Sequence, residues 1–381
     1  MFFTLRLIFI AASIFGTVSE MNRIYAASFI PLGDLPGGSF SSRANGVSDD
    51  GSVIVGGGVG ANGPEGFRWT VAGGIQPLGS MLIGPIVAAE ATAVSSDGMF
   101  IAGFEANSGI VRSYRWTNGT GLVNLGALAG GGNLVVASAV DVFGDVYGTS
   151  DSSAGNRAFR WRGTDSNIFE VGSVPGGFSS SGVTDVGYSG TVETVGFVSS
   201  GLIPQAAKIS PSPITILGDL PGGIVQSVAN GVSNNGVVVG YGSTTAGEEA
   251  FRYTQFGGMV SLGDLPGGPV ESGATDVSND GSVIVGYGTT AVGQEAFVYG
   301  RSGSSMEHLQ ELLIDRLGAP ALQGWRLTSA NGISGNGRVV VGDGVDRGVA
   351  AQSSMGRQRR QYLGERRELG EQLRALDWRC D

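Results

Sequence analysis

The sequence predicts an all-β fold, a seven-bladed β-propeller made of four-stranded repeats. Three observations lead to this prediction. A heptapeptide, LGDLPGG, recurs along the chain, a second marker recurs at the same spacing, and each unit contains four short strand patterns separated by turn signals. A fixed period between about 20 and 50 residues is typical of solenoids and propellers, whose units bury their apolar faces against their neighbours.

The repeat has a period of about 46 residues. Its opening motif is complete at three positions and degraded at three others, so that units begin at residues 32, 78, 125, 171, 217 and 262. The valine of the following GVS-like motif keeps the same spacing, at Val47, Val94, Val140, Val186, Val232 and Val277. Two independent markers agree, and a partial seventh unit begins at about residue 318.

Within a unit, turn chemistry separates the four strands. In the fifth unit, Pro221 and Gly222 suit the central positions of a type II turn, because proline fixes φ and glycine accepts a positive φ. Four strand patterns follow, in SVANGVS, VVVGYG, EAFRYT and MVSLG. The small residues of the first pattern suit the crowded centre of a propeller.

Pairs of aromatic residues recur in the third strand pattern. Their members are two residues apart and therefore share one face of a strand, where we expect them to hold neighbouring units together. The pairs are Phe67 and Trp69, Tyr114 and Trp116, Phe159 and Trp161, Phe251 and Tyr253, and Phe297 and Tyr299.

The seventh unit is interrupted and incomplete. Residues 304–317 read as a helical insertion, with Ser304 and Glu307 at capping-box spacing and an apolar face that includes Leu309 and Leu313. Only the first two strands of the unit follow, and RGVAAQ, from Arg347, is a poor third strand. SFIPLG, near the N-terminus, reads as a fourth strand that would close the ring. A β-solenoid with two rungs per repeat is the alternative architecture.

Composition excludes several classes of function. The formal net charge of −10 gives no electrostatic footprint for a nucleic-acid partner. His308 is the only histidine and Cys380 the only cysteine, so a Ser-His-Asp triad and a His or Cys metal centre are not expected. We expect no cofactor.

The two ends of the chain differ from the repeats. Residues 1–26 read as a signal peptide, because Arg6 precedes an apolar run that is too short to span a bilayer and Ala26 suits cleavage. The repeat domain would then occupy residues 27–352, with no transmembrane span after signal removal. Residues 353–381 form an Arg-rich tail, which we interpret as helical or disordered. An uncleaved anchor is the alternative to a signal peptide.

Carboxylates are the remaining candidates for chemistry. Asp34, Asp219 and Asp264 lie in the turns, and Glu249 and Glu295 lie beside the aromatic strand. Because they recur at equivalent positions, we interpret them as turn caps and surface pairs. The SDDG, SSDG and SNDG motifs lack the alternating oxygen ligands of a calcium loop and read as hairpin turns. We therefore assign no catalytic, cofactor-binding or metal-binding residue.

The repeats, with LGDLPGG, turns of the GVSNDG kind and AFRW-like strands, resemble the HAF-repeat family of extracellular repeat proteins over residues 28–345. The tripeptide positions read Glu65-Gly66-Phe67, Arg157-Ala158-Phe159, Glu249-Ala250-Phe251 and Glu295-Ala296-Phe297, without the histidine that names the family. The resemblance implies an exported protein and no particular activity.

We therefore predict an exported, non-enzymatic module for binding, adhesion or scaffolding at the cell surface, in the periplasm or outside the cell. Its partner would be an extracellular glycan or protein, bound by the variable loops between second and third strands. A carbohydrate-active hydrolase or lyase is the first alternative, which an acidic pair in a channel, unmatched in other units, would favour. A structural protein of an envelope layer is the second.

Overall fold

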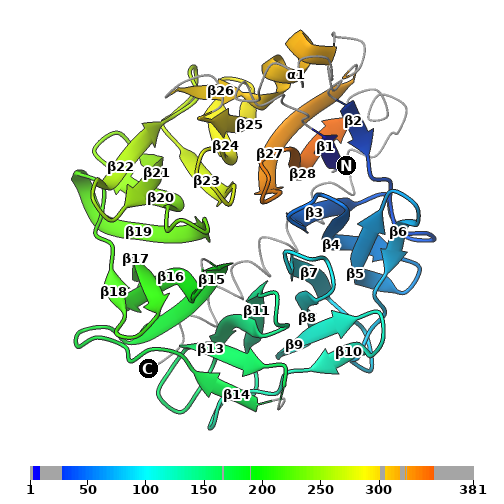
Figure 1. Cartoon of the computed structure of the whole chain (residues 1–381). Coiled ribbons are helices and arrows are strands. Elements are labelled where there is room, and N and C mark those ends of the chain that lie inside the picture. The colour runs from blue at the N-terminus through cyan, green and yellow to red at the C-terminus, as the bar shows by residue number, and fades with distance from the viewer. Residues whose placement is uncertain are drawn as a thin grey trace.

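The repeats fold into antiparallel sheets arranged radially around one axis (Figure 1). The computed structural model describes residues 3–8, 28–164, 167–188, 190–300, 305–317, 322 and 324–346, with the backbone alone at 3–8, 316, 317 and 346. The predicted β-propeller class is confirmed. The solenoid alternative is wrong, because the sheets surround an axis and do not stack into a rod.

Six sheets, which we call blades one to six, each contain four strands that follow one another in the sequence. The first strand of each lies nearest the axis (Figure 1). Blade one contains β3 (Ser42–Val47), β4 (Val53–Gly60), β5 (Gly63–Thr70) and β6 (Gly74–Pro77). Blade two contains β7 (Ala88–Val94), β8 (Ile101–Asn107), β9 (Ile110–Thr117) and β10 (Gly121–Asn124). Blade three contains β11 (Val135–Val140), β12 (Val146–Ser150), β13 (Arg157–Arg162) and β14 (Asn167–Glu170).

The other three complete blades follow the same order. Blade four contains β15 (Ser180–Tyr188), β16 (Val192–Ser200), β17 (Ile203–Ser210) and β18 (Thr215–Ile216). Blade five contains β19 (Gly222–Val232), β20 (Val238–Thr244), β21 (Glu248–Thr254) and β22 (Gly258–Gly263). Blade six contains β23 (Ser272–Val277), β24 (Ile284–Thr290), β25 (Gly293–Tyr299) and β26 (Met306–His308).

A further sheet, which we call the closing sheet, combines the two ends of the described chain. From the axis outward it contains β27 (Trp325–Ile333), β28 (Val339–Asp346), β1 (Phe3–Ile8) and β2 (Ser28–Pro31). β2 takes the fourth-strand position expected for SFIPLG. The third strand is β1, which the sequence assigned to the signal peptide, and it pairs antiparallel with both β28 and β2. A short apolar run suits a buried strand as well as a leader, so periodicity cannot separate the two.

The register of β1 matches the third strands of the complete blades. Arg6 pairs with Val341, as Arg68 pairs with Val55 in blade one. The sequence Leu5-Arg6-Leu7 therefore occupies the positions of Phe67-Arg68-Trp69. This apolar-Arg-apolar pattern is a sequence signal for a third strand, and the signal-peptide interpretation did not take it into account. The predicted leader core runs from Leu7 to Val18, and its part after Ile8 lies outside the described residues, as do the cleavage site and the tail at 353–381.

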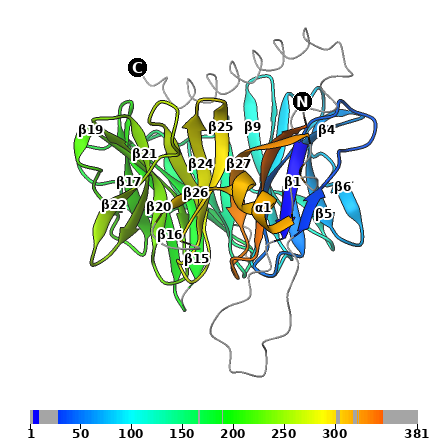
Figure 2. The same cartoon turned by 90° about the horizontal axis from the view of Figure 1, so that it is seen from above.

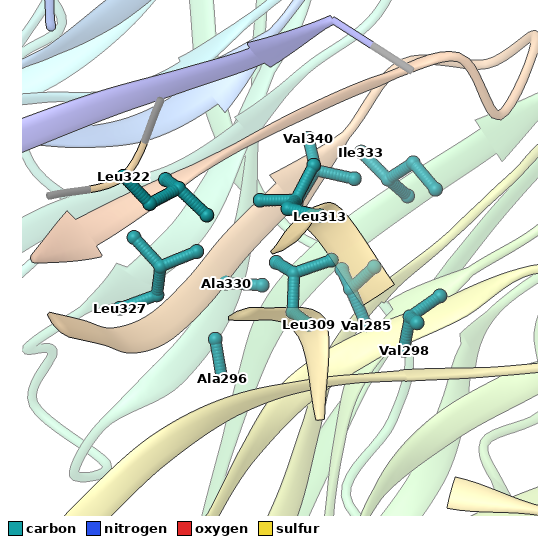
Figure 3. Packing of buried hydrophobic residues seen from close by; sticks show 10 residues of the cluster. All are labelled: Val285, Ala296, Val298, Leu309, Leu313, Leu322, Leu327, Ala330, Ile333 and Val340. Atoms are coloured by element: carbon teal, nitrogen blue, oxygen red, sulfur yellow. The ribbon is translucent and has the colours of Figure 1, made fainter. Parts of the chain in front are cut away.

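The helical insertion begins later than predicted. α1 spans Leu309–Leu317, and Met306–His308 instead forms β26, which pairs with Phe297–Tyr299. The edge of β25 needs backbone partners, and this requirement outweighs the local capping signal at Ser304. Leu309 and Leu313 of α1 are buried with Val298 and Leu327 (Figure 3). The helix thus packs on the outer rim between blade six and the closing sheet (Figures 1 and 2).

The repeated aromatic side chains pack between adjacent sheets. Phe67 and Trp69 share a cluster with Val339 and Val341 of the closing sheet, and equivalent clusters join the other neighbours. Seven of the ten predicted residues are buried: Phe67, Trp69, Tyr114, Phe159, Trp161, Phe251 and Phe297. The other three, Trp116, Tyr253 and Tyr299, are half-buried. Blade four has Ala207 and Ile209 at the equivalent positions, both buried.

A glycine in every second strand permits the first two strands to approach closely. A Cβ atom on Gly240 would lie 1.9 Å from the carbonyl oxygen of Val228, where the register of β19 and β20 shifts. The ring of Phe251 covers the same spot. At the equivalent glycines an added Cβ would likewise lie within 2.3 Å of a backbone oxygen; they are Gly56, Gly103, Gly148, Gly196, Gly286 and Gly342.

Candidate functional site

Side chains of the innermost strands form a ring of hydrogen bonds around the axis. At the second position of the ANGV-like motif in six of the seven sheets, an amide or hydroxyl donates to the backbone carbonyl of the next sheet. The pairs are Asn45 Nδ2 and Ala91 O (2.9 Å), Thr92 Oγ1 and Ala137 O (2.9 Å), Thr184 Oγ1 and Ala229 O (2.7 Å), Asn230 Nδ2 and Ala274 O (2.8 Å), Thr275 Oγ1 and Ala330 O (2.6 Å), and Asn331 Nδ2 and Ala44 O (2.8 Å). Ser138 occupies this position in blade three.

A cavity of about 530 Å³ lies at the axis, inside this ring. Its wall consists of the second halves of the innermost strands and the first residues of the turns that follow them. We call the side of the molecule that carries these turns the hairpin face. The lining is mostly polar and includes Asn45, Thr92, Ser138, Thr184, Asn230, Thr275 and Asn331. Such a wall offers many hydrogen-bonding groups to a small polar ligand.

Two carboxylates in the wall break the symmetry of the repeat. Asp185 of blade four and Asp276 of blade six stand where the other sheets have glycine or alanine. An Oδ atom of Asp185 accepts a hydrogen bond from the backbone N–H of Val232, 2.8 Å away in blade five. Asp276 accepts one from the N–H of Ile333, also at 2.8 Å, in the closing sheet. Each carboxylate therefore joins two neighbouring sheets.

The surroundings raise the pKa of both groups. Burial raises the pKa of Asp185 to about 6, although hydrogen bonds from Val232 and Val186 oppose the shift. Burial and the nearby negative charge of Asp185 raise the pKa of Asp276 to about 8, with a smaller contribution from Asp49. The two carboxyl groups titrate as an interacting pair, so near neutral pH they hold a proton that ordinary aspartates would lose.

The cavity is acidic throughout. Its described lining residues include Asp49, Asp141, Asp185 and Asp276, and no lysine, arginine or histidine. Asp49 accepts a hydrogen bond from Asn279 at 2.7 Å. Asp141 accepts one from the Tyr147 hydroxyl at 3.0 Å, and burial raises the pKa of its carboxyl. Among the described residues, no group of three or more metal-ligating side chains is placed to hold a metal ion.

Two exposed aromatic rings stand at the hairpin face beside the cavity. Tyr188 lines the cavity, and its ring meets the ring of Phe143 edge to face, with centroids 5.6 Å apart. Phe143 is 57% exposed and Tyr188 is 41% exposed. The backbone N–H of Tyr188 donates to Asn234 Oδ1 at 2.8 Å, which fixes the chain at this position. A solvent-exposed pair of rings beside an acidic cavity is available to contact a ligand.

The carboxylates singled out from the sequence lie away from this cavity. Asp34 accepts hydrogen bonds from the N–H groups of Leu35 and Ser41, at 2.9 and 2.8 Å, and Asp219 and Asp264 accept from Gln226 and Glu271 at 3.3 and 3.2 Å. These three residues hold the repeated turn. The turn glycines Gly37, Gly222 and Gly267 have φ of 84°, 98° and 102°, as the type II assignment requires.

Glu249 and Glu295 have local partners in their own blades. Glu249 accepts hydrogen bonds from Thr244 Oγ1, at 3.1 Å, and from Ser261 Oγ. Glu295 lies 3.4 Å from Nδ1 of His308. His308 lies within the predicted helical insertion, but in the structure it belongs to β26 and is half-buried. The structure does not bring these residues together into one site.

The turns with SDDG, SSDG and SNDG are hairpin turns closed by their own side chains. The hydroxyl of Ser48 donates to Asp50 at 2.8 Å, and Ser95 and Ser278 donate to Asp97 and Asp280 at 2.6 and 2.7 Å. The carboxylates are occupied within the turn, and so the motif serves local structure.

The acidic pair departs from the features that the repeats share, so the repeat pattern itself does not predict it. Aligning the units at the GVS valine puts Asp185 and Asp276 at one position, where the other units read glycine or alanine. That departure from the repeat was the available signal. The closeness of the two groups across blade five could be learned only from the ring geometry.

No protein-family model matches the chain, and no curated protein matches it either. Solved structures are similar in fold. An oligogalacturonate lyase from Vibrio parahaemolyticus superimposes with a TM-score of 0.50 at 9% identity, covering 91% of this chain and 98% of that one. A virginiamycin B lyase from Staphylococcus aureus gives 0.46 at 14% identity, with coverage of 79% and 94%. TolB from Acinetobacter baumannii gives 0.45 at 11% identity; the match covers 78% of this chain and 65% of that TolB.

At identities this low, the similarity to these structures is a similarity of fold alone. Among the described residues, no helix is long and apolar enough to cross a membrane.

Proposed function

We propose that the chain is an exported, non-enzymatic binding module of the HAF-repeat kind, and that its axial cavity holds a small polar ligand. The observation that carries this proposal is the cavity of about 530 Å³, lined by amides, hydroxyls and carboxylates of the innermost strands. Preformed concave sites with a few convergent polar groups are where small ligands usually bind. The repeat motifs, which resemble those of extracellular repeat proteins, support export to the periplasm, the cell surface or the medium.

We also propose that the closing sheet acts as a seventh blade, which gives the seven-bladed ring expected from the sequence. Contacts of β27 and β28 with β3 support this proposal. A closed ring fixes the innermost strands relative to one another, and it thereby keeps the wall of the cavity in place. Preorganisation of this kind reduces the entropy that binding must overcome.

A plugged cavity tests the proposed function. The chain and its Ser138→Trp variant would be screened by calorimetry against amines, sugars, organic acids and short peptides, with Ser138→Thr as the matched control. Ser138 suits this purpose because it lines the cavity and takes no part in the ring of interblade hydrogen bonds described above. We expect a ligand that binds the chain and Ser138→Thr but not Ser138→Trp.

A ligand that binds all three proteins equally would contradict the proposal. In that case the binding surface would lie elsewhere, for example on the loops between second and third strands, such as residues 151–156 and 245–247. These loops lie on the opposite face from the hairpin turns, since successive strands of a blade run antiparallel. A single cooperative melting transition of Ser138→Trp would serve as the control that this variant still folds.

A second candidate function is hydrolysis or elimination on a carbohydrate. The observation in its favour is the pair Asp185 and Asp276, which has no counterpart in the other sheets and whose pKa values differ. Two carboxyl groups with separated pKa values can act as acid and base. Turnover of a polysaccharide that is abolished in Asp185→Asn or Asp276→Asn, and kept in Glu249→Ala, would establish this function in place of the first.

A further inference from the structure

We infer that the axial cavity binds an organic cation, an alkylammonium ligand whose charged group lies between Asp185 and Asp276 and whose chain leaves the cavity past Tyr188 and Phe143. This inference rests on the proposed function, since it names the ligand class of the same cavity. It depends on three features together: the cavity, the sign of the charges in its wall and the aromatic pair at its edge.

The charge in the wall favours a cation. Four of the described lining residues are aspartates, and none is a lysine, arginine or histidine, so this part of the wall contains no positive counter-charge. A cavity with walls of one sign concentrates ligands of the opposite sign. Bringing a positive charge next to Asp185 and Asp276 would offset the repulsion between them, which a neutral sugar cannot do.

The aromatic pair adds a second preference for the same ligand class. Tyr188 lines the cavity and Phe143 supports it edge to face at 5.6 Å, with both rings partly open to solvent. The face of an aromatic ring attracts ammonium groups, and its apolar surface accepts methylene groups. A cation contact with an aromatic ring already occurs between blades two and three, where the guanidinium of Arg115 lies 4.8 Å from the ring of Trp161.

An organic cation fits the wall better than a bare metal ion. Calcium needs six or more oxygen ligands, and magnesium demands an octahedral set. The described residues provide no cluster of three or more metal-ligating side chains. Backbone N–H groups already bind these carboxylates: Val232 donates to Asp185 at 2.8 Å, and Ile333 and Val277 donate to the two oxygens of Asp276 at 2.8 and 2.7 Å. The remaining lone pairs of these oxygens, with the amide and hydroxyl groups nearby, suit an organic cation that makes hydrogen bonds.

Proton linkage follows from the same geometry. A cation favours the ionised pair, so binding must displace the shared proton, and affinity should rise with pH between about 5 and 8. The other titratable groups in the cavity wall are Asp49, Asp141 and Tyr188. None of them carries a positive charge that would reverse this dependence.

Spermidine and tetramethylammonium are suitable probes, with maltose as a neutral comparison. Calorimetry of the full chain at pH 5 and pH 8 should give at least tenfold tighter binding of spermidine at pH 8. Asp185→Asn with Asp276→Asn should weaken binding at pH 8 at least tenfold, and Tyr188→Ala by about threefold. Asp97→Asn and Phe256→Ala are the controls, because they remove a carboxylate and an exposed ring from the same face but outside the cavity wall, and they should change affinity less than twofold.

Several results would overturn the inference while leaving the proposed function intact. These are tighter binding of maltose than of spermidine, binding of spermidine that is equal at pH 5 and pH 8, and equal losses in the Asp185→Asn, Asp276→Asn variant and in Asp97→Asn. Spermidine that binds Ser138→Trp as well as it binds the unmodified chain would instead count against the cavity itself. A single melting transition in each variant guards against unfolding as the cause of a loss.

Discussion

Nδ2 of Asn331 donates a hydrogen bond of 2.8 Å to the carbonyl oxygen of Ala44, which lies 287 residues earlier in the chain. It joins the closing sheet to blade one and is the last member of the ring around the axis. A second contact of the same kind lies at the hairpin face, where Nδ2 of Asn279 donates to Asp49 at 2.7 Å. The ring is therefore closed by side chains as well as by packing, and the cavity depends on this closure.

Replacing Asn331 by alanine should weaken the closed ring. The variant leaves the Ala44 carbonyl without its donor in a half-buried place, and we expect the free energy of unfolding to fall by about 1–2 kcal/mol. Denaturant titration followed by tryptophan fluorescence would measure the change. Asn118→Ala, in an exposed turn, is the matched control. An equal loss in both variants would mean that the bond to Ala44 contributes nothing specific.

The second-strand glycines give a sharper test of packing. Gly240→Ala would place a methyl group 1.9 Å from the carbonyl oxygen of Val228, so the first two strands of blade five must separate. We expect destabilisation of about 1–3 kcal/mol, the usual range for overpacking. Gly119→Ala introduces the same methyl group where no atom lies within 4 Å and should be neutral. Thermal unfolding of the two variants side by side decides the matter.

The pKa values of the acidic pair predict how stability depends on pH. Asp276 has a pKa of about 8 in the folded chain, against an ordinary value of 3.8, so the folded state holds a proton that the unfolded state releases. Stability from this group is complete below about pH 4 and is lost as pH rises towards 8. Asp276→Asn should therefore raise the melting temperature at pH 8 and change it less at pH 4. Each unit of pKa shift corresponds to about 1.4 kcal/mol.

Asp280 provides the opposite sign as a control. Burial opposes ionisation there, but hydrogen bonds from Ser282 and Ser278 outweigh it and lower the pKa of the carboxyl. Its contribution is lost as pH falls, so Asp280→Asn should cost stability at pH 7 and not at pH 2. A melting temperature of Asp276→Asn that follows the unmodified chain at every pH would contradict the assignment of the acidic pair.

The sequence was sufficient for features that each repeat specifies locally. The type II turn at Pro221 and Gly222, the four strands of a blade and the shared face of Phe251 and Tyr253 all follow from short-range chemistry and a period of two. Features that depend on a unit's neighbours were not predictable in this way. The strand at Met306 forms because the edge of β25 needs hydrogen-bond partners. Asp185 and Asp276 come together only because blades four and six lie on either side of blade five.

Removal of one buried ring tests the packing between blades. Phe251 is fully buried with Val195 and Ala206 of blade four. Phe251→Ala should destabilise the chain by about 3–5 kcal/mol, because it removes a large apolar group and leaves a cavity. Phe256, five residues later, is 99% exposed, so Phe256→Ala should change stability by less than about 0.5 kcal/mol. Equal effects in the two variants would show that the packing of the Phe251 ring against blade four does not hold the blades together.

The third strand of the closing sheet carries the last prediction. β1 pairs with β28 from Phe3 to Ile8 and also with β2, so a chain that begins at residue 27 should expose the edge of β28 and leave β2 without its partner. We expect a lower melting temperature and faster amide exchange over Val339–Asp346, with exchange in β12 unchanged. Leu5→Pro removes a backbone donor from the middle of β1 and should have the same effect in the full chain. Equal exchange over Val339–Asp346 in the long and short chains would mean that the closing sheet does not need β1, and the segment would then be free to serve as the leader that its apolar run predicts.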